Sequence, residues 1–385
     1  IPGNGINVYY SKFINNTAGY GGANYFGTAN NVNITGEFIN NKATRSGNTN
    51  GGSANYFNKA VTNVHISGNF ISNTIKGSSL THNEATNYFK ETATNVDISG
   101  KFINNTGQRL IYIAKVTSGG NVIHDSIFLN NQVSTVINSI GGVTARNNWF
   151  GNNASNYDKT PSNVGINLAS WLFLNATANP GEIILDENST IIFKLQSYDG
   201  SNVSDYDASK MNITMGLSQT LGQLDKNASS IGEEITYTVK KDGNAGVTAK
   251  YETASYTISL TNLKIPATID VANSTVDLKV NNETDMGATL TPADAGNLTY
   301  LSSNSSVAVV ENGKIKALAE GSTNITVSYA GNDRYEACQT NIEVTVTLND
   351  AQVSVNNATL DLVAGNTFDI VAVTNPLGLN VTYVE

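Results

Sequence analysis

The segment NVNITGEFINN, Asn31–Asn41, decides the fold of the first part of the chain, because close copies of it recur. NVHISGNF begins at Asn63 and NVDISGKF at Asn95, so each copy starts 32 residues after the previous one. A short sequence that returns at a fixed interval is typical of architectures in which each repeat stacks on its neighbours. The pattern therefore predicts a stack of repeats.

Two further motifs keep nearly the same interval. The tripeptide NYF starts at Asn24, Asn55 and Asn87. The motif Phe-x-x-Asn begins at Phe13, Phe38, Phe70, Phe102, Phe128 and Phe150. We expect these six rings to form one internal stack, with about 1.5–3 kcal/mol gained by the burial of each ring. The asparagines that close the motif are expected to form a ladder at a corner, and they are Asn16, Asn41, Asn73, Asn105, Asn131 and Asn153.

Alternation within each repeat indicates short strands. In NVNITGEF, Val32, Ile34 and Phe38 are predicted to point inward, and Asn33 and Glu37 outward. The apolar runs are too short for helices and lack the helical period of 3.6 residues. A repeat with one apolar face can bury that face only against the next repeat. The sequence thus predicts a parallel β-helix over residues 1–151.

The pattern changes after this region. Residues 152–174, which end with the apolar run WLFL, are predicted to form a cap and linker. Alternating strands separated by Asp-Gly turns then predict an immunoglobulin-like domain over residues 175–263. A second such domain is predicted over residues 264–348, and residues 349–385 are interpreted as a truncated start of a further one. The expected fold class is all-β, a parallel β-helix followed by immunoglobulin-like β-sandwich domains.

Composition narrows the range of partners. Charged residues are 14% of the 385 residues, and the net charge is −9. No basic stripe is present, so nucleic acid is not an expected partner. No run of about 18 apolar residues occurs, so no membrane insertion is expected in this fragment. The chain begins with Ile and stops in mid-pattern, so a secretion signal and an anchor are expected to lie outside it.

The candidate catalytic residues are few. The acids of residues 1–150 are Glu37, Glu84, Glu91, Asp97 and Asp125. The repeat interval places His65 next to Asp97, but both occupy outward slots whose residue type varies from repeat to repeat. We therefore expect a solvated pair rather than a catalytic one. Neither a Gly-x-Ser-x-Gly motif nor a phosphate loop is present.

Metal ligands are equally sparse. His65, His82, His124 and Cys338 lack the spacing of a zinc site. The acidic stretch Asp199–Asp207 lacks the spacing of a calcium loop, and we expect its carboxylates to be solvated. The lone Cys338 cannot form a disulfide within the chain and is expected to be a small buried apolar residue. We expect no catalytic, cofactor-binding or metal-binding residues, and no cofactor.

Three resemblances extend this interpretation. FINN at Phe13 with GGA at Gly21 resembles the repeat of the chlamydial polymorphic outer-membrane proteins. NVNITGEFINN together with NNWFGNN at Asn147 resembles the adhesin-like surface proteins of gut methanogenic archaea. The stretch LTYLSSNSSVAVVENGKIKALAEGSTNITVSYAGNDRYEA, residues 298–337, resembles the bacterial immunoglobulin-like domains of invasins and related surface stalks.

These resemblances imply an extracellular cell-surface adhesin rather than an enzyme. The β-helix would contact glycans or surface proteins of other cells, and the immunoglobulin-like domains would project it. The alternative is a β-helical polysaccharide lyase or hydrolase with accessory domains, and a third possibility is a structural envelope or fibre component. A groove with several acids and a basic residue favours the enzyme, whereas a flat or aromatic-lined face favours adhesion.

Sixteen Asn-x-Ser/Thr sequences mark the chain as a candidate glycoprotein. Examples begin at Asn15, Asn33, Asn104, Asn175, Asn212, Asn273, Asn324 and Asn380.

Overall fold

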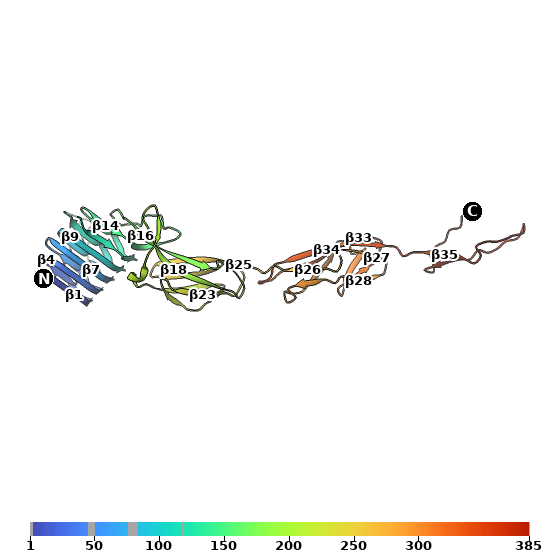
Figure 1. Cartoon of the computed structure of the whole chain (residues 1–385), viewed down its shortest axis with the longest axis horizontal. Coiled ribbons are helices and arrows are strands. Elements are labelled where there is room, and N and C mark those ends of the chain that lie inside the picture. Colours follow the sequence, from blue (N-terminus) through green and yellow to red (C-terminus); the bar gives the residue numbers. More distant parts are fainter. Residues whose placement is uncertain (1–2, 45–50, 76–83, 118, 385) are drawn as a thin grey trace. The chain divides into compact units, whose positions relative to one another are not determined.

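The computed structural model describes residues 3–44, 51–75, 84–117 and 119–384. These residues form strands throughout, with one 3-10 helix, η1 (Ala208–Met211), and no α-helix among them. The chain divides into two compact units, residues 1–263 and 264–385 (Figure 1). The expected all-β class is confirmed.

Strands of successive repeats pair in parallel in the first unit (Figure 1). The first sheet of this stack is formed by β1 (Gly3–Ile14), β4 (Ala29–Ile39), β7 (Val61–Ile71), β9 (Ala85–Ile103), β11 (Asn121–His124), β12 (Ile127–Leu129), β14 (Val143–Arg146) and β15 (Asn148–Asn153). The register from β4 to β9 places identical motifs level, so Phe38 lies beside Phe70 and Phe70 beside Phe102. Corresponding residues of successive repeats therefore lie side by side in the sheet.

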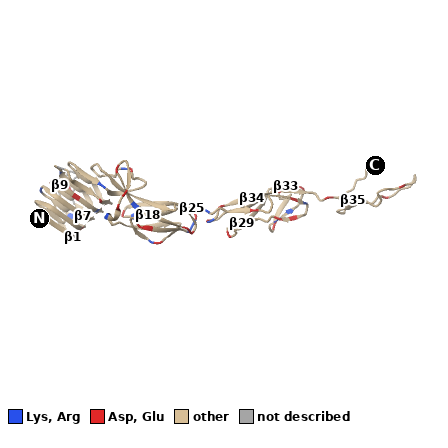
Figure 2. Ribbon diagram, in the orientation of Figure 1, with Lys and Arg blue, Asp and Glu red and all other residues tan. Residues whose placement is uncertain are grey.

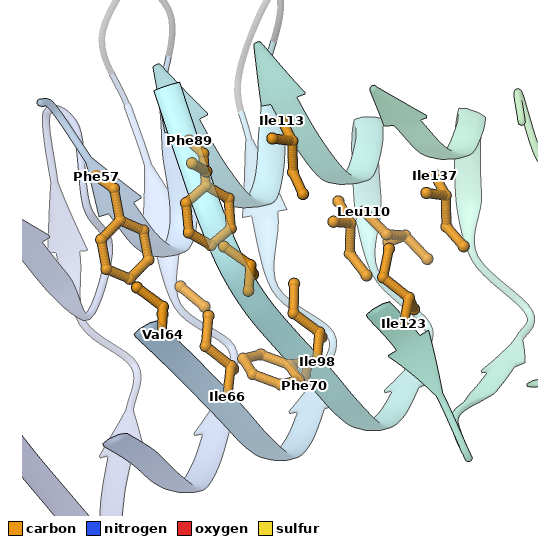
Figure 3. Packing of buried hydrophobic residues seen from close by; sticks show 14 of the residues in the cluster. Phe57, Val64, Ile66, Phe70, Phe89, Ile98, Leu110, Ile113, Ile123 and Ile137 are labelled. Carbon is orange, nitrogen blue, oxygen red and sulfur yellow. The ribbon is translucent and has the colours of Figure 1, made fainter. Parts of the chain in front are cut away.

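A second parallel sheet faces the first. It contains β2 (Thr17–Ala18), β3 (Asn24–Phe26), β5 (Lys42–Ala43), β6 (Gly52–Phe57), β8 (Thr74–Ile75), the first part of β9, β10 (Thr106–Lys115) and β13 (Gln132–Ser139). Phe57 and Phe89 of this sheet point toward Val64, Ile66 and Ile98 of the first sheet (Figure 3). The apolar core of the stack lies between the two sheets.

The predicted phenylalanine stack is confirmed. Phe38, Phe70 and Phe102 are fully buried, and their ring centroids are separated by 4.8 and 4.7 Å with nearly parallel planes. Phe13, Phe128 and Phe150 extend the stack at centroid separations of 4.9–5.2 Å. The parallel strand spacing of about 4.8 Å falls within the range of centroid separations for offset-stacked rings, so identical aromatic residues can stack in register.

An asparagine ladder runs beside the rings. The side-chain amide of Asn73 donates to Asn105 Oδ1 at 3.1 Å and to the carbonyl of Phe38 at 2.7 Å. Its own Oδ1 accepts the backbone N–H of Asn41 at 3.0 Å. A buried amide that forms hydrogen bonds to both neighbouring repeats supplies partners to backbone groups that would otherwise be unpaired at the corner. The expected ladder is confirmed at these positions, whereas the expected sixth member, Asn153, donates to the carbonyl of Ser255 at 2.8 Å.

The last parallel strand also begins a β-sandwich. β16 (Trp171–Asn179) pairs in parallel with β15 and antiparallel with β18 (Asn188–Tyr198). The domain boundary expected between residues 174 and 175 therefore falls inside a strand. The run WLFL covers the end of the stack and starts the sandwich at the same time.

The sandwich has two layers, whose strands pair antiparallel except for the parallel pair of β17 (Glu182–Ile184) and β25 (Ala254–Leu263). One is formed by β16, β18, β19 (Val203–Asp205), β23 (Glu234–Val239) and β21 (Gly222–Leu224). The other is formed by β17, β25, β24 (Ala245–Tyr251), β20 (Thr214–Thr220) and β22 (Ala228–Ser230). Its core holds Phe193 and Tyr237 together with Ile127, Leu129 and Trp149 from the stack. The last strands of the stack thus contribute side chains to the apolar core of the sandwich.

The second unit is also built from strands. Its four-stranded sheet is formed by β27 (Thr275–Lys279), β34 (Cys338–Thr347), β33 (Gly321–Tyr329) and β30 (Thr299–Ser302). Smaller sheets are formed by β28 (Glu283–Asp285), β32 (Lys314–Ala317) and β31 (Ala308–Glu311), and by β26 (Thr268–Asp270) and β29 (Thr289–Thr291). Ile325 and Val344 of the large sheet pack with Ile315 of a smaller sheet in one buried cluster. β35 (Gln352–Val355) and β36 (Ala372–Asn375) pair antiparallel.

Replacement of the central ring tests the stack. Phe70→Ala should lower the free energy of unfolding by about 3–5 kcal/mol, because it opens a cavity between two buried rings. Glu37→Ala is the control, since this side chain makes only a solvent-exposed ion pair with Lys12, and the variant should stay within about 0.5 kcal/mol. Chemical denaturation of the two variants measures the difference. Equal losses would contradict the inward and outward assignment.

Candidate functional site

A polar cleft lies in the first unit, where the outer face of the stack meets η1 of the sandwich. Its volume is about 410 Å³. The stack contributes Ser67–Asn69 from β7, Ser99–Lys101 from β9, and the His124–Asp125 pair. The sandwich contributes Lys210–Asn212, from the end of η1. The cleft therefore exists only because the stack and the sandwich are joined.

Glycines form part of the cleft wall for a packing reason. A Cβ atom on Gly68 would lie 2.2 Å from the carbonyl oxygen of Gly36, and one on Gly100 would lie 2.1 Å from that of Gly68. No side chain fits against the preceding repeat at these positions. Glycine at positions 36, 68 and 100 thus lets the strands approach closely and leaves backbone rather than side chain along this line of the stack.

Histidine and aspartate side chains form a cluster at the edge of the cleft. Asp97 lies between His65, at 3.6 Å, and His124, whose Nε2 is 2.8 Å from Asp97 Oδ1. The second ring nitrogen of His124, Nδ1, lies 2.9 Å from Asp125 Oδ2. Tyr206 of the sandwich donates a hydrogen bond of 2.8 Å to Asp125 Oδ1. The cluster links three strands of the stack to the sandwich.

The predicted His65–Asp97 pair is present and outward-facing. The two side chains are 42% and 47% exposed, as expected for outward slots of the repeat. Sequence reasoning missed the part played by His124 and Tyr206. His124 follows Asp97 by 27 residues rather than by the interval of 32, and Tyr206 lies outside the repeats. The signal that remained was the degenerate copy NVIHDS, which begins at Asn121.

Two lysines lie in the cleft, one from each side. Lys101 Nζ donates to the backbone carbonyl of Asn212 at 2.7 Å and lies 5.7 Å from the centroid of the Tyr251 ring. Burial lowers the pKa of Lys101. Lys210, on η1, is exposed. Lys101 thus bridges the stack and the sandwich, while Lys210 faces solvent.

The hydrogen-bond partners limit the chemistry of the acidic groups. Both ring nitrogens of His124 lie within hydrogen-bond distance of carboxylates, and Asp125 Oδ1 accepts the hydrogen bond from Tyr206. These side chains therefore form one continuous line of polar contacts from Asp97 through His124 and Asp125 to Tyr206. Over the ranges 3–44, 51–75, 84–117 and 119–384, no group of three or more His, Cys, Asp or Glu side chains is arranged to hold a metal ion.

The acidic stretch Asp199–Asp207 is held by local bonds. Asp199 Oδ1 accepts the backbone N–H groups of Asn202 and Ser201, which lower the pKa of this carboxyl. Gln196 and Lys194 contact Asp205 and lower its pKa in the same way. These carboxylates stabilise the turn and the neighbouring strand.

The remaining sequence candidates lie elsewhere. Cys338 is a free thiol that is half-buried in the second unit, beside the cluster that contains Tyr329 and Tyr335. His82 lies outside the described residues. Figure 2 shows the positions of Lys, Arg, Asp and Glu scattered along the ribbon among other residues. Within the part of the chain that the structure describes, no helix is long and apolar enough to cross a membrane.

Comparison with known proteins identifies one domain class. Residues 267–334, which are 68 of the 385 residues, match the family described as bacterial Ig-like domain (group 2). This match confirms the resemblance of residues 298–337 to bacterial immunoglobulin-like domains. A search of curated proteins found no match.

Solved structures give weak similarities. A C-terminal 282-residue fragment of intimin, solved in complex with the intimin-binding domain of the translocated intimin receptor, is 15% identical. The TM-score is 0.20, and the match covers 47% of this chain and 65% of the fragment. Domains 4 and 5 of the S-layer protein SbsC are 17% identical, with a TM-score of 0.20 and coverage of 45% and 96%. These values are too low to assign a function.

The hydrogen bond from Tyr206 tests how firmly the sandwich is attached to the stack. Tyr206→Phe should lower the free energy of unfolding at pH 7 by about 1–2 kcal/mol, because it removes a donor from a largely buried carboxylate. Tyr256→Phe, in the opposite layer of the sandwich, is the matched control. Denaturation monitored by tryptophan fluorescence measures both, and equal effects would contradict the role of the bond.

The same bond predicts a pH dependence. Burial and the contact with Asp125 raise the pKa of Tyr206 above its ordinary value of 10.0. The folded state therefore keeps this proton at a pH where the unfolded state loses it, and the stabilisation is complete below pH 10 and declines above it. The stability gap between the wild type and Tyr206→Phe should shrink as the pH rises past 10.

Proposed function

We propose that this chain is part of an extracellular, adhesin-like surface protein in which a parallel β-helix makes the contacts and immunoglobulin-like domains project it. The observation that carries this proposal is the bacterial Ig-like domain at residues 267–334, on the same chain as a stack of in-register repeats. Sandwich domains in series add reach rather than chemistry. A repeat stack adds a long regular surface.

The pairing supports a parallel β-helix as the form of the stack. Two parallel sheets share a core, and the same residue type recurs at each level of it. The Phe and Asn ladders require each repeat to turn in the same way as the one before it. The proposed partners are glycans or surface proteins of other cells.

The outer surface of the stack supports a contact role. Asn31, Asn63 and Asn95 are exposed, and their amides form a hydrogen-bonded ladder with distances of 2.8 and 3.0 Å. Their φ angles of 53–55° lie in the left-handed region, which asparagine tolerates better than most residues. The result is a rigid array of uncharged polar groups. Such an array suits weak contacts that gain strength from repetition.

The alternative function has one observation in its favour. The cleft brings Asp125, His124 and Lys101 together, as a polysaccharide lyase or hydrolase requires. The mutual occupation of the carboxylate and the imidazole favours binding over catalysis. A purely structural envelope role would need neither the cleft nor the exposed ladders.

The adhesin proposal predicts which unit binds cells. Fragments 1–263 and 264–385 should be displayed on beads at equal density, because a cut after residue 174 would divide β16. Beads that carry residues 1–263 should retain microbial or epithelial cells, and beads that carry residues 264–385 should not. Circular dichroism should be used to check that each fragment is folded. Adhesion by the second fragment alone would reverse the assignment.

An activity assay separates the alternative. The intact chain should release no reducing or unsaturated ends from polygalacturonate, mucin glycans or cell-wall polymers, because Asp97 and Asp125 are both engaged with His124. Product that appears with the wild type and disappears with Asp125→Asn would establish an enzyme. Glu311→Gln, in the second unit, is the matched control for the loss of one carboxylate.

A further inference from the structure

We propose that the cleft between the stack and η1 is a binding site for an acidic saccharide, whose carboxylate or sulfate group lies between Lys101 and Lys210. This inference rests on the proposed function and specifies the class of glycan that the stack takes. The cleft volume of about 410 Å³ suits one or two sugar units rather than a protein segment.

Charge selects the ligand. The two lysines come from opposite walls of the cleft, while Asp125, the acid that lines it, is bonded to His124 and Tyr206. The nearby Asp207 accepts the backbone N–H of Ser209 at 3.1 Å. The acids keep their charge, and Asp207 also interacts with Lys210, but hydrogen bonds within the protein hold their oxygens. The ammonium groups therefore supply the charged donors for a ligand. Two ammonium groups at one site favour an anion.

Lys101 gains from such a ligand. Its Nζ is partly desolvated, which lowers the pKa of the side chain, and the bond to Asn212 uses one of its three donors. An anionic group beside a half-buried ammonium compensates for lost hydration. Lys101 therefore carries a partly desolvated charge that a carboxylate or sulfate would stabilise.

The rest of the wall suits a sugar. Ser67 and Ser99 are level with each other on neighbouring strands, and so are Asn69 and Lys101. Strand neighbours are about 4.8 Å apart, so the wall presents pairs of hydroxyl and amine or amide groups at a regular spacing. The glycines at positions 68 and 100 bring backbone to the surface between these pairs. No Phe, Tyr or Trp side chain lines the cleft in the described residues, so recognition depends on polar groups rather than on stacking against such a ring.

The test uses the intact chain and defined oligosaccharides. Isothermal titration calorimetry should compare an oligogalacturonate, its fully methyl-esterified form, and a sulfated oligosaccharide of similar length. The proposal expects an acidic ligand to bind at least about tenfold more tightly than the neutral ester, because the ester removes the ionic partner of both lysines. Raising the salt concentration should weaken the acidic ligand alone. Preference for the carboxylate or for the sulfate identifies which acidic group the site takes.

A pair of lysine variants locates the site. Lys210→Gln should weaken binding of the acidic ligand by about three- to tenfold and leave the neutral ester unchanged. Lys210 is chosen because it is exposed, whereas Lys101 also holds the junction with the sandwich. Lys115→Gln is the matched control, since Lys115 is an exposed lysine on β10 of the other sheet.

Three results would overturn the inference. Equal affinity for the acidic and neutral ligands would show that the lysines do not select charge. Equal losses in Lys210→Gln and Lys115→Gln would show diffuse attraction rather than a site. No binding of acidic oligosaccharides by a chain that still retains cells on beads would remove this ligand class and leave the adhesin proposal standing. If the chain neither binds acidic oligosaccharides nor retains cells on beads, the adhesin proposal is also contradicted.

Discussion

In-register stacking of the repeats is the constraint on which the first unit depends. A register shift of one residue between β4 and β7 would place Phe38 opposite a residue that points to the other face of the sheet. It would also separate the side-chain amides of Asn41 and Asn73. The ring stack and the amide ladder therefore favour the same register. Apolar burial supplies much of the stability, and the amides make the register specific because a buried amide without partners is costly.

The same constraint divides the residues of each repeat into two kinds. Inward positions keep their identity because every level must fit its neighbours, as Val32, Val64 and Val96 do. Outward positions meet water and can differ, as Asn33, His65 and Asp97 do. A repeat stack of this kind can therefore change its exposed chemistry without changing its fold.

The junction between the stack and the sandwich shows what happens where the repetition ends. β15 directs Phe150 toward the core of the stack and Trp149 toward the core of the sandwich. Trp149 is fully buried, and its Nε1 donates to the carbonyl of Asn152 at 2.9 Å. An open apolar end is thereby covered by a second domain rather than by a separate cap. The cleft is a consequence of this junction, because η1 of the sandwich lies beside β7 and β9.

The sequence by itself determined the repeats, the inward residues, the phenylalanine stack, the asparagine ladder and the Ig-like character of residues 267–334. These features are periodic or local, so the repeat interval alone indicates which residues of neighbouring copies contact each other. Only the tertiary structure decided that WLFL belongs to both the stack and the sandwich. It also decided the contacts that cross this junction, which are Lys101 with Asn212, Asp125 with Tyr206, and Asn153 with Ser255. The partners in these contacts are separated by 111, 81 and 102 positions in the sequence. Those contacts join unlike surfaces. Their partners depend on how two folded faces fit together, and no interval in the sequence records that fit.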